Sequence, residues 1–219
     1  MRACTNWTYQ LGMGGNPGAS MYTYAQAETI LARLYGADEQ TQRNAFRGRL
    51  KHLKRVGIPL NMSPGRGKKV LYTREHLFQW ALCLEFAEFG VDPTVTSHFI
   101  HTMWGHFHLI VAWMLSKPND GNDIIYTINP VVMSKTWAYK DVAYEFREHF
   151  LDFLNFRPGQ TSDAIELIGE LKNICRRAML INVSEVLRMI DAESRNLGIE
   201  PEIPNVRAKR VGDVIVAVD

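Results

Sequence analysis

One segment of the chain, residues 40–74, combines a strong positive charge with the apolar spacing of a helix. It contains ten basic residues and no acidic residue, whereas the whole chain of 219 residues contains 25 basic and 23 acidic ones. The rest of the chain therefore carries 15 basic against 23 acidic residues and is acidic overall. Such a local excess of positive charge is what a surface that binds a polyanion needs.

The first half of this segment predicts an amphipathic helix over residues 41–56. Phe46, Leu50 and Leu53 are spaced i, i+4 and i+7, so they share one face of a helix. Most of the basic residues fall on the opposite face, which predicts a helix with one buried side and one cationic side. Gly48 lies in mid-helix, where glycine costs about 1 kcal/mol relative to alanine. It either permits the close approach of a ligand or marks a crossing of two helices.

Two further helices are expected on either side of this one. The first spans residues 24–35, where Thr23 and Gln26 have the spacing of a capping box. The next spans residues 73–89 and starts at Thr73, which is a suitable N-cap residue.

Between the second and third helices the sequence predicts a short β-hairpin. Residues 58–62 and 68–72 are β-prone, and they flank the turn-forming sequence Ser-Pro-Gly-Arg-Gly. The resulting order is helix, turn, cationic helix, basic hairpin and helix. It predicts a winged helix-turn-helix DNA-binding domain over residues 21–92.

Three stretches of this region resemble the MerR-type winged helix-turn-helix DNA-binding domain. They are AETILARLYG, RGRLKHLKRVGIPL and GKKVLYTREHLFQWALCLEFAEFGVDP, and together they span about a third of the chain. The resemblance implies a short wing that closes in an aromatic residue, followed by a helix that ends at a glycine turn. The chain departs from the family at residues 48–52, where an Arg-Tyr-Tyr-like phrase is usual, and the family's long dimerisation helix is not evident.

Double-stranded DNA is therefore the expected partner. The N-terminal residues of a recognition helix meet base edges in the major groove. Arginine can bond guanine there, and asparagine or glutamine can bond adenine. Cations further along the helix and on the wing would meet phosphates. The predicted base-contacting residues are Thr41, Gln42, Arg43, Asn44 and Arg47, and the predicted phosphate-contacting residues are Lys51, Lys54, Arg55, Arg66, Lys68 and Lys69. An RNA partner or a solvated face without a partner would fit the same charge pattern.

The whole chain predicts a mainly α protein of the α+β class. A flexible tail is expected over residues 1–20, and a dimerisation or effector domain of helices with a small β-sheet over residues 93–219. Strands are expected within residues 124–133 and at the C-terminus, over residues 210–219, and they are expected to pair with each other. The helices expected in this second domain span residues 94–115, 136–156, 162–180 and 182–197.

Other side chains offer little support for catalysis. The sequence has no GxSxG, HExxH, P-loop or GxGxxG motif, so no enzyme and no cofactor are predicted. The three cysteines are far apart and form no metal or disulfide framework. Four histidines lie close together, and they fit a metal site, a packed or partner-facing cluster, or a pH-sensitive one: His98, His101, His106 and His108.

Taken together, these patterns predict a bacterial-type transcriptional regulator that acts as a homodimer on duplex DNA. RNA polymerase is a further candidate partner. No signal peptide and no membrane-spanning run are evident, so a cytoplasmic, nucleoid-associated location without membrane contact is expected. Two alternatives remain open. One is a non-regulatory architectural or phage-type DNA-handling factor, and the other is a ligand or metal sensor in which the cationic surface is incidental.

Overall fold

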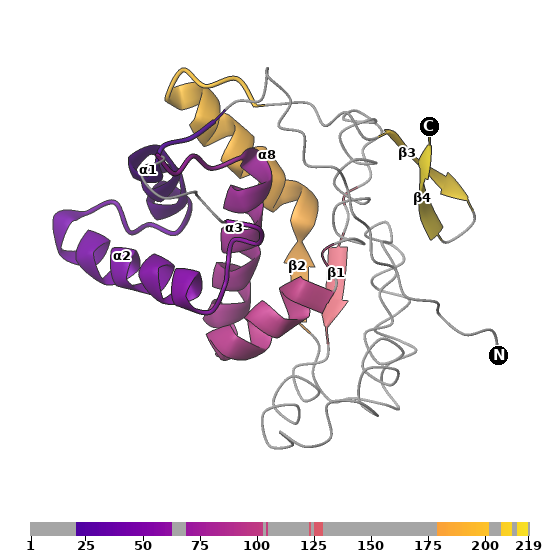
Figure 1. The fold of residues 1–219 in the computed structure, drawn as a ribbon, viewed down its shortest axis with the longest axis horizontal. Coiled ribbons are helices and arrows are strands. Elements are labelled where there is room, and N and C mark those ends of the chain that lie inside the picture. The colour runs from indigo at the N-terminus through magenta and orange to yellow at the C-terminus, as the bar shows by residue number, and fades with distance from the viewer. Residues whose placement is uncertain are drawn as a thin grey trace.

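The computed structural model of the chain is mainly helical, which confirms the expected fold class at that level (Figure 1). It describes residues 21–62, 69–102, 104, 123, 125–128, 179–201, 207–211 and 214–218. The labelled helices are α1 (Tyr24–Leu34), α2 (Gln40–Arg55), α3 (Arg74–Glu88) and α8 (Val183–Asn196). The labelled strands are β1 (Ile125–Ile128), β2 (Met179–Asn182), β3 (Arg207–Val211) and β4 (Val214–Val218). Residues 93–102 are also helical.

The three N-terminal helices confirm the sequence-based expectations to within one residue at each end. Thr23 caps α1 through a capping box with Gln26, and Thr73 caps α3 in the same way with His76. Each cap satisfies backbone N–H groups that a helix start otherwise leaves unpaired. Gly57 follows α2 with a φ of +90°, a conformation that favours glycine and turns the chain away from the helix.

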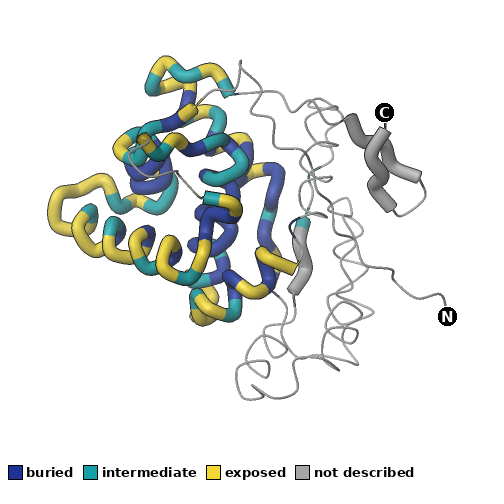
Figure 2. Tube along the Cα trace, in the orientation of Figure 1, coloured by how far each residue is buried: buried dark blue, intermediate teal, exposed yellow. Residues whose placement is uncertain are grey.

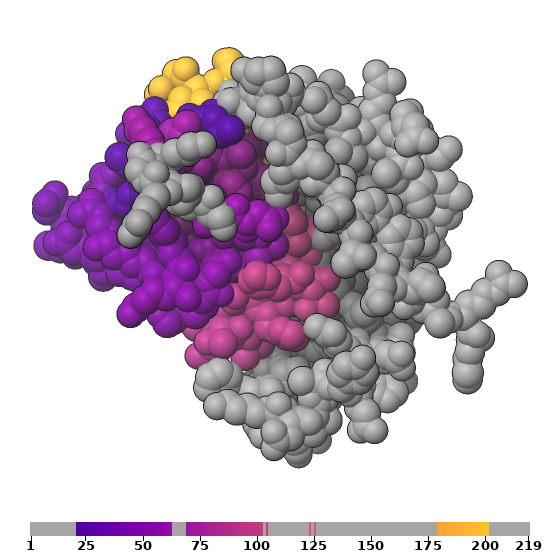
Figure 3. Space-filling model, in the orientation of Figure 1, coloured from indigo at the N-terminus to yellow at the C-terminus, as the bar shows by residue number. Residues whose placement is uncertain are grey.

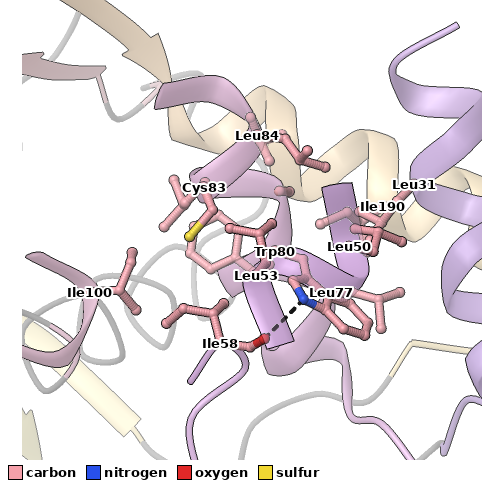
Figure 4. Packing of buried hydrophobic residues seen from close by; sticks show 14 of the residues in the cluster. Leu31, Leu50, Leu53, Ile58, Leu77, Trp80, Cys83, Leu84, Ile100 and Ile190 are labelled. Carbon is pink, nitrogen blue, oxygen red and sulfur yellow. Dashed lines mark hydrogen bonds between the residues drawn. The ribbon is translucent and has the colours of Figure 1, made fainter. Parts of the chain in front are cut away.

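The four labelled helices share one hydrophobic core (Figure 4). Leu31 from α1, Leu50 from α2, Trp80 from α3 and Ile190 from α8 are all fully buried in it. Helix α8 belongs to the part of the sequence assigned to a second domain, yet it packs against α1 and α3. The core therefore crosses the boundary expected at residue 92.

Polar contacts also join α8 to the N-terminal helices. Arg74 at the start of α3 makes a two-point ion pair with Asp191 of α8, and both side chains are largely buried. Tyr22 donates a hydrogen bond to Ser194 Oγ over 3.0 Å, and Ser194 in turn donates to the carbonyl of Ile190. Helix α8 is thus held to the rest of the core by buried polar groups as well as by apolar packing.

The strand expected over residues 58–62 is not formed, and this part of the prediction is wrong. These residues make a turn, in which Asn61 has a left-handed φ of 59°. Tyr72 instead forms an antiparallel bridge with Tyr22, just before α1. Residues 63–68, the expected tip of the wing, lie outside the described residues.

The expected pairing of the C-terminal strand with residues 124–133 is also wrong. Strand β4 pairs with β3, and β1 pairs with β2, each in antiparallel register. Residues 179 and 180 belong to β2 rather than to the end of the helix expected over residues 162–180. Helix α8 lies within the range of residues 182–197 expected for it, and Asn182 caps it with a side chain that accepts from the Glu185 N–H.

Several expectations concern residues outside the described parts. They are the tail over residues 1–20, the second half of the helix over residues 94–115, the helix over residues 136–156 and, except for its last two residues, the helix over residues 162–180. Among the helices that the structure does describe, none is long and apolar enough to cross a membrane.

Candidate nucleic-acid interface

Helix α2 lies along one edge of the described part of the molecule (Figure 1). Its inner face is buried through Phe46, Leu50 and Leu53, the residues that the sequence pattern placed there. The face of α2 opposite these residues is exposed, whereas α3 is largely buried (Figure 2). The space-filling view shows the same helix as a projecting part of the surface (Figure 3). One side of α2 is therefore available to a partner.

The chain that leaves α2 is fixed by side chains of neighbouring helices. The carbonyl of Ile58 accepts a hydrogen bond from the Trp80 indole over 3.2 Å (Figure 4), and the N–H of Leu60 donates to Gln79 over 2.6 Å. Ser97 donates to the carbonyl of Val56 over 2.6 Å. These bonds satisfy buried backbone groups that no strand partner satisfies. They hold the C-terminal end of α2 in place.

The residues that point directly away from the core form what we call the outward row of α2. They are spaced i, i+3, i+7, i+10 and i+14, and all of them are exposed: Thr41, Asn44, Gly48, Lys51 and Arg55. A Cβ added at Gly48 would meet nothing within 4 Å. Within the described residues, Gly48 therefore does not mark a helix crossing, and the surface around it is open.

Arg43 and Arg47 do not lie in the outward row. They lie on the flank of α2 that faces α1, where both bind the buried carboxylate of Glu28. Arg47 donates through Nε and Nη2 over 2.9 and 2.8 Å, and Arg43 donates through Nε over 3.3 Å. Arg43 also donates through Nη2 to Thr29 Oγ1 over 2.6 Å. We refer to Glu28, Thr29, Arg43 and Arg47 as the Glu28 cluster.

The Glu28 cluster holds more positive than negative charge, and its positive groups are the more exposed. The side chain of Glu28 is only 3% exposed, whereas those of Arg43 and Arg47 are 31% and 43% exposed. One carboxylate faces two guanidinium groups, so the cluster keeps one net positive charge at the surface. Hydrogen bonding from Arg47, followed by that from Arg43, holds the pKa of Glu28 below its usual range, although burial acts in the opposite direction.

This lowered pKa gives a pH-dependent prediction for Glu28→Gln. A carboxyl whose pKa is lower in the folded state stabilises the fold above its unfolded pKa of about 4.3, and the benefit is lost as pH falls through the folded value. The stability difference between wild type and Glu28→Gln should therefore shrink as the pH falls from neutral to below about 4. Urea denaturation across this pH range measures it. Glu88→Gln, which alters an exposed ion pair, is the control, and equal pH profiles for the two variants would contradict the prediction.

Lys54 lies on the same flank, about two helical turns beyond Arg47. Its Nζ donates to the Tyr72 hydroxyl over 3.1 Å and lies 5.5 Å from the ring centroid of Tyr24 and 5.8 Å from that of Tyr72. Cation–π attraction of this kind restrains an ammonium group without neutralising it. Arg43, Arg47 and Lys54 thus form an anchored row of cations beside the outward row.

The remaining predicted site residues belong neither to the Glu28 cluster nor to the anchored row, and each is placed separately. Gln42 and Lys69 are exposed, and Arg55 lies 3.5 Å from the imidazole of His52. Arg66 and Lys68 lie outside the described residues. Two further basic residues of the cationic segment are already paired within the protein, because Arg49 binds Glu88 and Arg74 binds Asp191.

The histidines do not form a metal site in the described part of the chain. No group of three or more potential metal ligands occurs there. His98 and His101 are both exposed, and His106 and His108 lie outside the described residues.

Glu28 is the functional candidate that the sequence analysis missed. It adjoins the apolar stripe of α1, next to Ala27 and three residues before Leu31, both of which are fully buried. An acidic residue beside such a stripe, followed by a helix rich in arginine, is the pattern that could have indicated a buried carboxylate.

Comparison of the chain with protein-family models, with curated proteins and with solved structures finds no match.

Proposed function

We propose that this protein binds duplex DNA through α2. The observation that carries the proposal is the outward row, an exposed and unobstructed helix face with two cations and no acidic residue. An exposed helix of this kind fits the major groove of DNA, which is about 12 Å wide. Sequence-independent attraction to phosphates would supply much of the affinity.

The positions of the α2 side chains favour a different division between base contacts and phosphate contacts from the one that the sequence predicted. Asn44 lies in the outward row near the N-terminal end of α2, where it can reach a base edge, and asparagine pairs best with adenine. Lys51 and Arg55 follow on the same face and would contact phosphates. Arg43 and Arg47 are turned to the flank by Glu28, so we assign them to phosphates rather than to bases.

The finer proposal is a MerR-like helix-turn-helix regulator of transcription that acts as a homodimer in the cytoplasm. The order of α1, α2 and α3 and their common core support it. Helix α8 packs on α1 and α3, which in turn pack on α2, so a change elsewhere in the chain that moves α8 would reach α2 through these two helices. The metal-sensor alternative depends partly on His106 and His108, which lie outside the described residues, and the described residues hold no metal-ligand cluster.

Selection from a pool of random-sequence duplexes tests the proposal. The full-length protein should enrich a discrete motif, and its affinity should fall steeply between about 50 and 200 mM salt. Salt-sensitive binding without any enriched motif would favour the architectural alternative. Lack of duplex binding at low salt would refute the proposed function.

Gly48→Ala should separate stability from binding. Alanine is the better helix former, and its Cβ meets no neighbour, so the free energy of unfolding should rise by about 1 kcal/mol. The added methyl group lies in the middle of the outward row and would hold a DNA surface away from the helix, so affinity for the selected duplex should fall. Thermal unfolding and fluorescence anisotropy measure the two effects. Ala45→Gly on the same helix is the control, since it should reduce stability without obstructing DNA.

A further inference from the structure

We infer that Glu28 is a positioning residue, which holds the guanidinium groups of Arg43 and Arg47 ready to bind the phosphate backbone of DNA. This inference rests on the proposed function and specifies the ligand of the flank beside the outward row. It assigns a binding role to an acidic residue inside a cationic surface, where charge alone would make Glu28 unfavourable.

The hydrogen-bond geometry leaves both guanidinium groups able to bind a second anion. A guanidinium has five N–H donors in one plane. Arg47 uses Nε and Nη2 to hold Glu28, and Arg43 uses Nε for Glu28 and Nη2 for Thr29. Each group therefore keeps three N–H donors, and no residue in the described part of the chain accepts a hydrogen bond from them. The Nη1 edge of each plane is free for a phosphate, which arginine binds in a bidentate manner.

Burial of Glu28 makes it a fixed support. Its carboxylate is almost completely enclosed, whereas both arginines are partly exposed. The two arginines lie four residues apart, about 6 Å along α2, and share the same carboxylate. Their orientation is therefore set before DNA arrives, which removes part of the entropy cost of ordering long side chains on binding.

A comparison within the chain separates this cluster from an ion pair that serves the fold alone. Arg74 and Asp191 form a one-to-one pair in which both side chains are largely buried, and that pair leaves no charge at the surface. The Glu28 cluster joins two partly exposed cations to one buried anion and keeps a net positive charge. Only the second arrangement presents unused donors and positive charge to solvent.

Glu28→Gln provides the first test, because charge counting and positioning predict opposite results. Removing a negative charge beside two arginines should tighten DNA binding if charge alone matters. If Glu28 positions the arginines, affinity for a random-sequence duplex should instead fall about tenfold. The slope of log affinity against log salt should also become shallower by up to about 1.8, because two phosphate contacts are weakened. If Glu28→Gln were instead partly unfolded, the apparent affinity would fall by the same factor at every salt concentration, and the slope would not change.

Arg47→Lys provides a second test that keeps the charge. Lysine cannot hold Glu28 and a phosphate with one planar group, so we expect affinity to fall about fivefold to tenfold and the salt slope to become shallower. Arg49→Lys and Glu88→Gln are the matched controls, since they change an exposed ion pair on the other flank of α2. Both should bind as the wild type does. Circular dichroism of each variant at the assay temperature verifies that it is folded.

The outcomes distinguish the two proposals. If wild type binds duplex and Glu28→Gln binds more tightly with an unchanged salt slope, the positioning role is refuted while the DNA-binding function stands. The same holds if Arg47→Lys behaves like Arg49→Lys. If wild type binds no duplex, the proposed function fails and the role of Glu28 fails with it.

Discussion

Replacing Arg74 with methionine is expected to lower the free energy of unfolding by about 3–5 kcal/mol, the usual cost of removing one partner from a buried ion pair. Arg74 and Asp191 have side chains only 7% and 15% exposed, and they meet through two hydrogen bonds. Methionine fills similar space but leaves the carboxylate of Asp191 without its partner. Urea denaturation at neutral pH measures the loss.

Arg33→Met is the matched control for this prediction. Arg33 also joins α8 to the N-terminal helices, through Glu193, but its side chain is 42% exposed. Exposed pairs of this kind contribute roughly 0.2–1 kcal/mol. Equal losses for Arg74→Met and Arg33→Met would contradict the assignment of Arg74 as the main polar link to α8. The double variant Arg74→Met with Asp191→Leu should recover much of the stability, because no unpaired charge then remains.

The anchoring of α8 also shows what the sequence could not reveal. Asp191 lies 117 residues from Arg74, and the sequence offers no indication that they meet. Arg74 appeared as one of ten cations in a DNA-facing segment, yet it is buried in the core. A charge pattern predicts which residues are basic, whereas long-range packing decides which of them reach the surface.

Local features, by contrast, were predictable. The limits of α1 and α3 follow from capping boxes and glycine stops, and those of α2 follow from apolar spacing and the stop at Gly57, all of which act within a few residues. The apolar face of α2 was correct for the same reason, since Phe46, Leu50 and Leu53 are set by helical geometry alone. The pairing of β4 with β3 is equally local, because only Gly212 and Asp213 separate the two strands, and a two-residue Gly-Asp connection is typical of a hairpin. The pairing of β1 with β2 was not predictable in this way, because these strands lie far apart in the sequence and the tertiary fold brings them together.

The candidate site was predictable only in part. Helical periodicity correctly placed the cations of α2 away from its apolar face, but it could not distinguish the outward row from the flank that faces α1. That distinction depends on Glu28, which comes from a different helix. The sequence therefore indicated which helix presents a cationic face, and only the three-dimensional arrangement separated Lys51 and Arg55 from the two arginines that Glu28 holds.

The second large effect is expected for the double variant Lys51→Ala with Arg55→Ala. Both residues are exposed in the outward row, where their charges would lie next to DNA phosphates. Each phosphate contact contributes about 0.9 to the slope of log affinity against log salt, so losing two should cost about 60-fold in affinity near 0.1 M salt. The slope itself should become shallower by about 1.8. Fluorescence anisotropy with the selected duplex over a range of salt concentrations measures both quantities.

The control for this variant changes net charge by the same amount elsewhere on the surface. Arg33→Ala with Arg195→Ala removes two cations that are 42% and 57% exposed and that lie outside α2. If binding depends on where the charge lies, this variant should keep nearly the full salt slope. If the two double variants lose affinity equally, net charge alone governs binding. The outward row would then not be the DNA-binding surface, because a helix seated in a groove is sensitive to the position of each cation as well as to their number.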